Sequence, residues 1–111
     1  AYARFYEQIH QLLDASEWSV VYRYDKNAAD LAALKETAAK TGKAENFIAL
    51  AKLHIKNGHY GKALEAANHA VKNEPKNAGA FYILGLTQGY NNLLYESDKS
   101  FAKAEELGFK I

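Results

Sequence analysis

The stretch from Glu45 to Pro75 reads ENFIALAKLHIKNGHYGKALEAANHAVKNEP, and the predicted fold rests on it. Its apolar residues recur at the spacings of amphipathic helices in two successive runs. Asn57-Gly58 separates the runs, and this dipeptide favours a turn. The second run stops before Pro75, which cannot continue a helix. We therefore predict a helix–turn–helix unit.

A second unit of the same kind runs from Ala78 to Ile111. Aromatic, aliphatic and small residues follow in the same order in both units. In the first they are Phe47, Leu50, Ala51, His54, Gly58, Tyr60, Ala63, Ala67, Ala70 and Pro75, and in the second Phe81, Leu84, Gly85, Gln88, Leu94, Ser97, Phe101 and Ala104. Two helices approach to about 8–10 Å only where the crossing residues are small, so each unit is predicted to be a packed antiparallel pair. The turn recurs as Asn91-Asn92, and Asn tolerates a left-handed backbone.

This pattern resembles the tetratricopeptide repeat, a helix–turn–helix of 34 residues. The chain departs from the repeat's signature at His54 and Gln88 for Tyr, at Ala67 for Phe, and at Phe109 for Pro. The resemblance implies one all-α domain over residues 1–111, a right-handed solenoid of about seven antiparallel helices. Its repeats would be 44–77 and 78–111. The alternative is a pair of helical hairpins that share the spacing by coincidence.

Residues 1–43 do not align to the repeat and are predicted to form a helical N-terminal extension that caps the array. Apolar spacing predicts a helix over 2–14. Ser16 begins either a short second helix or, by the alternation of its aromatic residues, a strand, and the helix is favoured because a lone strand has no pairing partner. A third helix is predicted over 27–41, with Asn27 as its N-cap and Thr41-Gly42 as its end. We expect it to lie against the first helix of the first repeat.

Composition indicates one small globular domain, since 49% of the 111 residues are hydrophobic and 24% are charged. The formal net charge of +1 provides no long-range field for nucleic acid or anionic lipid. Cysteine is absent, which excludes disulfides and thiolate chemistry and leaves both bacterial cytoplasm and periplasm open. The apolar run Phe47–Ala51 is far shorter than the ~20 residues of a membrane helix, so we expect no membrane insertion. A chain that begins at Ala1 is expected to be a processed protein or a fragment.

The resemblance implies that binding takes place on the concave face, which the first helix of each repeat lines. The candidate groove residues are Ile48, Lys52, Ile55, Lys56, Tyr82, Ile83, Leu86 and Tyr90. Tyrosine is a frequent recognition anchor because it buries a large area while losing few rotamers. We expect a peptide or partner helix to dock there. The alternative is that the N-terminal segment, especially Trp18–Tyr24, folds back and fills the groove.

Catalytic chemistry is not indicated. The four histidines, His10, His54, His59 and His69, show no metal-ligand spacing, and no nucleophile or phosphate loop stands out. We therefore expect no enzyme activity, metal or cofactor. The leading hypothesis is a protein-interaction scaffold. The alternatives are a self-association module, with homo-oligomers formed through the N-terminal helices, and an RNA-binding helical repeat, against which the low net charge argues.

The second repeat carries Asp98 and Glu105 where the first carries Leu64 and Val71. The apolar pair is predicted to face the next helix. Burying the two carboxylates there would cost several kcal/mol without partners, so we expect the array to end at this face. Gly108 is predicted to stop the last helix, with the residues after it folding back over Phe101.

Overall fold

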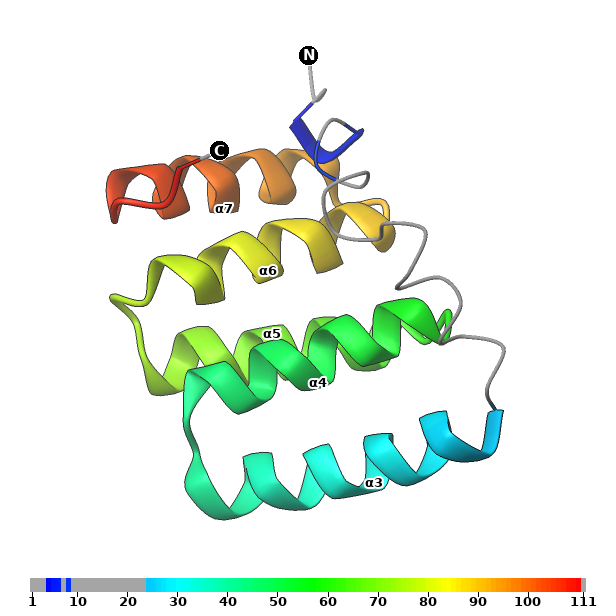
Figure 1. The fold of residues 1–111 in the computed structure, drawn as a ribbon. Helices are drawn as coiled ribbons and strands as arrows, with labels where there is room; N and C mark the ends of the chain where they lie inside the picture. The colour runs from blue at the N-terminus through cyan, green and yellow to red at the C-terminus, as the bar shows by residue number, and fades with distance from the viewer. Residues whose placement is uncertain (1–3, 7, 9–23, 111) are drawn as a thin grey trace.

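The computed structural model describes residues 4–6, 8 and 24–110, and every regular element in them is an α-helix (Figure 1). The helices are α3 (Tyr24–Thr41), α4 (Ala44–Lys56), α5 (Tyr60–Asn73), α6 (Ala78–Tyr90) and α7 (Leu94–Glu106). Residues 4–6 and 8 are also helical. The all-α prediction is confirmed for this part of the chain. Within the same residues, none of the helices is both long and apolar enough to cross a bilayer.

α4 pairs with α5 and α6 pairs with α7, so the chain contains two helical hairpins (Figure 1). Their helices begin at corresponding positions of the two predicted units. The turns correspond as well, because Gly58 and Asn92 both have a left-handed backbone, with φ of 77° and 64°. Glycine adopts this conformation without strain, and Asn is among the few other residues that tolerate it.

The second hairpin packs closely because Gly85 has no side chain. A Cβ atom at this position would lie 2.8 Å from the Phe101 ring, closer than real Cβ contacts allow. The Ser97 hydroxyl also donates a hydrogen bond of 2.6 Å to the Gly85 carbonyl. In the first hairpin the corresponding positions, Ala51 and Ala63, are fully buried. The small crossing residues therefore bring the paired helices together in both hairpins.

α3 covers α4, as expected, and buries Ala38 almost completely. It ends at Thr41, followed by Gly42 with a φ of 66°, which confirms the predicted stop. The predicted N-cap at Asn27 is wrong, because the helix already begins at Tyr24. No Gly or Pro lies between these two residues, so nothing in the backbone prevents the helix from starting earlier.

The remaining predictions on the extension are tested only in part. Residues 4–6 and 8 are helical, in agreement with the helix predicted over 2–14. The rest of that range and the Ser16–Tyr22 stretch lie outside the described residues. The helical residues 4–6 are drawn beside α6 and α7, far from α3 (Figure 1). The two described parts of the extension thus lie at opposite ends of the helical stack.

Candidate functional site

The eight predicted groove residues do not share one open face. Ile55, Ile83 and Leu86 are core residues, with exposures of 3%, 0% and 0%. Ile48, Lys56, Tyr82 and Tyr90 are partly buried, and Lys52 is exposed. Ile83 and Leu86 are buried because their helix, α6, carries no charged residue and packs between α5 and α7. A helix that is apolar on all sides is buried rather than half open.

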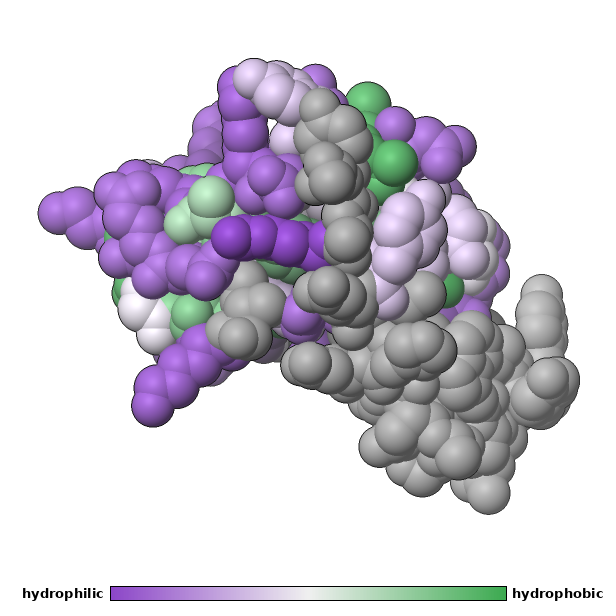
Figure 2. Space-filling model, turned by 90° about the horizontal axis from the view of Figure 1, so that it is seen from above, coloured by the Kyte–Doolittle hydropathy of each residue, from purple (hydrophilic) through white to green (hydrophobic). Residues whose placement is uncertain are grey.

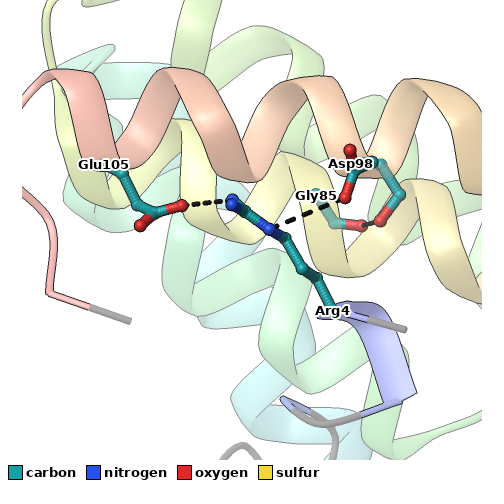
Figure 3. Close-up of polar contacts among 5 residues, drawn as sticks. Arg4, Gly85, Asp98 and Glu105 are labelled. Carbon is teal, nitrogen blue, oxygen red and sulfur yellow. Dashed lines mark hydrogen bonds and ion pairs between the residues drawn. The ribbon is translucent and has the colours of Figure 1, made fainter. Parts of the chain in front are cut away.

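The part of α6 that faces outward is occupied by the chain's own N-terminus. We call Arg4, Phe5, Tyr6 and Gln8 the N-terminal segment; three of its side chains contact α6 and α7. Arg4 lies between two carboxylates of α7 (Figure 3). Its Nε is 3.7 Å from Asp98 Oδ1, and its Nη1 donates a hydrogen bond to Glu105 Oε1. The three side chains stay 40–44% exposed, so this contact is at the surface.

Phe5 fills the space left by the missing side chain of Gly89. A Cβ atom at Gly89 would lie 2.0 Å from Phe5 Cδ1, so the ring and any side chain exclude each other. Phe5 also meets Tyr90 edge to face, with ring centroids 4.9 Å apart and planes at 88°. Tyr90 in turn stacks on Tyr60 of α5 at 4.8 Å. Phe5 is 7% exposed, so an aromatic ring is buried in this notch.

Gln8 makes the third contact of the segment, with Tyr82 of α6. The Tyr82 hydroxyl donates a hydrogen bond of 2.8 Å to Gln8 Oε1, and Gln8 is only 3% exposed. Burial raises the pKa of Tyr82 above its ordinary value of 10, so the hydroxyl keeps its proton at neutral pH. The Phe109 ring stacks on the Tyr82 ring, with ring centroids 4.3 Å apart. The predicted return of the C-terminal residues therefore ends on Tyr82, with Phe101 tilted next to it.

These contacts hold the segment only moderately. An exposed ion pair contributes about 0–1 kcal/mol, and a hydrogen bond contributes about 0.5–1.5 kcal/mol. Burying one Phe side chain contributes about 1.5–3 kcal/mol. Ordering each residue opposes this by roughly 1–2 kcal/mol. The cost of ordering the segment is therefore at least as large as the contribution of these contacts, so they do not hold it strongly.

Sequence reasoning missed Arg4 and Gln8, and it assigned Asp98 and Glu105 only to a polar edge. Two signals were present in the sequence. Asp98 and Glu105 are seven residues apart, so they share one face of α7 and together attract a single cation. Arg4 and Gln8 are four residues apart, so they too share one helical face, next to Phe5.

Seen from above in Figure 2, the described surface is mostly hydrophilic and its hydrophobic residues form separate patches.

A second cluster of polar groups lies away from this face, in a cavity of about 220 Å³ between α3, α4 and α5. His54 in its lining is 2% exposed, and its Nδ1 atom has no hydrogen-bond partner. Burial, followed by the charge of Lys35, lowers the pKa of His54 from 6.5 to about 4. The imidazole is therefore neutral at physiological pH. Among the described residues, no group of three or more His, Asp or Glu could hold a metal ion.

No family model matches the chain, and no curated protein matches its sequence.

Proposed function

We propose that the chain is a non-enzymatic protein-interaction module of the tetratricopeptide-repeat type, which binds a helical peptide segment on the face of α6 and α7. The observation that carries this proposal is that the face already holds helical residues of the chain itself, residues 4–6 and 8. An amphipathic helix laid in a groove is a common mode of peptide recognition, with anchors about one turn apart. Phe5 and Gln8 are spaced in this way.

The assignment to the repeat class is supported by the hairpins. The starts of α4 and α6, and of α5 and α7, fall at corresponding repeat positions. The left-handed turn residues Gly58 and Asn92 correspond as well. Neither hairpin presents a catalytic constellation among the described residues. A protein-interaction module requires a binding surface and no catalytic groups.

The alternative function is self-association by exchange of the N-terminal segment between copies. It is favoured by the position of the contact, since Arg4 and Glu105 are 101 residues apart in the chain. Every contact that the segment makes within one chain can be made equally with a second copy, as in domain swapping. Sedimentation velocity at increasing protein concentration distinguishes the two functions, because only exchange gives a dimer population that rises with concentration.

A library of helical peptides displayed on phage tests the main proposal. The bait is the full chain with Phe5→Ala, which empties the notch at Gly89. We expect enriched peptides whose binding is lost when the bait also carries Gly89→Ala, because the added Cβ fills the notch. Lys72→Ala is the control, since Lys72 is exposed on α5. Enrichment of peptides that tolerate Gly89→Ala, or no enrichment at all, would refute the proposal.

A further inference from the structure

We propose that the face of α6 and α7 recognises a helix that presents Arg, an aromatic residue and Gln at positions i, i+1 and i+4. The N-terminal segment would then act as a built-in competitor for the same site. This inference rests on the proposed function and specifies its partner. The partner is a foreign helical segment with these three side chains. Its chemistry is inferred from the three contacts of the chain's own segment: the carboxylate pair of α7, the notch at Gly89 and the Tyr82 hydroxyl.

The carboxylate pair selects the cation. Asp98 and Glu105 are two helical turns apart on α7, and each contacts a different nitrogen of the Arg4 guanidinium. A planar guanidinium with several fixed donors can bridge two acceptors, whereas the compact ammonium of Lys acts as a point charge. Within the described residues, Arg4 is the cation recorded at ion-pair distance from both carboxylates. The pair therefore favours Arg in a partner.

The notch at Gly89 selects the aromatic residue. The Phe5 ring lies where a side chain at 89 would lie, and Tyr90 meets it at right angles. A flat ring fits this narrow space and gains the edge-to-face contact. Tyr6, the next residue, is 55% exposed, and its ring meets the Phe5 ring edge to face with centroids 5.2 Å apart. The ring that fills the notch at Gly89 is that of Phe5.

The Tyr82 hydroxyl selects the third residue. It donates to the Gln8 side-chain oxygen, and its partner is almost completely buried. An apolar residue at this place would leave the partly buried hydroxyl without this acceptor, and a polar site disfavours ligands that cannot complete its hydrogen bonds. Arg and Gln at i and i+4 lie on one helical face, with the aromatic residue beside them, so a single helix can meet all three requirements.

The segment competes because it is tethered to the face it occupies. A tethered ligand acts at a high effective concentration, so a partner in trans binds with an apparent affinity reduced by the fraction of open molecules. Weakening the segment is therefore expected to increase partner binding without any change in the face itself.

The probe for the experiment is a fluorescein-labelled peptide with the sequence of residues 2–14, YARFYEQIHQLLD. Its binding is measured by fluorescence anisotropy to the full chain and to a released variant that carries Arg4→Ala, Phe5→Ala and Gln8→Ala. We expect binding to the released variant to be about tenfold tighter or more, since the competitor is removed. Equal binding to the two proteins would overturn the competitor role.

Charge reversal tests the recognition pattern independently of folding. A peptide with Arg4→Glu is expected to lose binding to the released variant by about tenfold or more, as an interfacial charge pair turned repulsive does. Adding Asp98→Lys and Glu105→Lys to the released variant is expected to restore binding of this peptide, a gain that an unfolded protein cannot give. The peptide with Tyr6→Ala is the matched control and is expected to bind like the parent. Loss of binding without reciprocal rescue would refute the assigned pattern.

The outcomes separate this inference from the proposed function. If displayed peptides bind the Gly89 face but the 2–14 peptide does not compete with them, the face binds helices and the recognition pattern is wrong. If neither binds, both proposals fall. The unmodified chain is expected to sediment as a monomer. A dimer that the 2–14 peptide dissociates would assign the face to a second copy and overturn the foreign partner.

Discussion

His54 is expected to make the stability of the domain depend on pH below neutrality. It lies on α4 with 2% exposure, and its Nδ1 atom has no hydrogen-bond partner. Burial is the largest cause that lowers its pKa, and nearby positive charge on Lys35 and Lys62 adds to it. Protonating the ring in the folded state would bury a charge beside other cations. The folded state therefore binds a proton on His54 less readily than the unfolded chain does.

The magnitude follows from the two pKa values. The pKa of His54 falls from the ordinary value of 6.5 to about 4 in the folded protein. Each unit of difference corresponds to about 1.4 kcal/mol, which gives roughly 3 kcal/mol as the largest effect. Between these pH values the unfolded state binds more protons, so the free energy of unfolding rises with pH. The contribution is complete above pH 6.5 and is lost as the pH falls toward 4.

Urea unfolding followed by circular dichroism at pH 7.5, 5.5 and 4.5 measures this effect. The variant His54→Leu replaces the ring with an apolar side chain of similar size and removes the unpaired nitrogen. We expect its free energy of unfolding to fall less on acidification than that of the unmodified chain, by about 2–3 kcal/mol at the lowest pH. His69→Gln is the control, because His69 is exposed on α5. If His54→Leu and the unmodified chain show the same pH profile, the reasoning is refuted.

Further predictions concern glycine and turn positions, all measured by urea unfolding. Gly85→Ala should destabilise the second hairpin by about 1–3 kcal/mol through overpacking, because its Cβ meets the Phe101 ring at 2.8 Å. Gly61→Ala is the matched variant: it is helical with nothing within 4 Å, so it should stabilise by about 0.5–1 kcal/mol. Gly58→Ala should destabilise by about 1–2 kcal/mol, since its φ is left-handed. Asn92→Gly relieves the equivalent strain, and a marked loss of stability there would contradict this account of the turns.

The ends of the helices in the two hairpins were predictable because local chemistry decides them. Asn57-Gly58 and Asn91-Asn92 supply the left-handed residues on which the two turns depend. Pro75 and the N-cap Asn77, whose Oδ1 accepts a hydrogen bond of 3.0 Å from the Ala80 N–H, separate the hairpins. The start of α3 was predicted wrongly because Asn27 is a favourable N-cap residue. The helix nevertheless begins three residues earlier, at Tyr24. Local signals identify a helix more reliably than they locate its first residue.

The site was harder to predict because it depends on contacts between distant parts of the chain. The periodicity of α6 could not distinguish groove residues from core residues, because apolar residues occupy every side of that helix. Ile83 and Leu86 therefore read as groove residues although they are completely buried. The partner of the outward side, the N-terminal segment, is reached only through tertiary folding. Its possible return was predicted for Trp18–Tyr24, of which residues 18–23 lie outside the described residues and Tyr24 begins α3. The recorded contacts are made by Arg4, Phe5 and Gln8.

The two hairpins use equivalent positions of their second helices in opposite ways. Leu64 and Val71 of α5 are partly buried and pack against the apolar core, and α5 contacts α6. Asp98 and Glu105 of α7 instead bind one guanidinium and remain partly exposed. An apolar pair at these positions would bind the N-terminal segment through the hydrophobic effect, which salt does not screen. A carboxylate pair loses attraction as ionic strength rises, and water and salt compete for each of its charges. The outer face of the second hairpin is therefore covered in part by a charged contact that salt and water weaken.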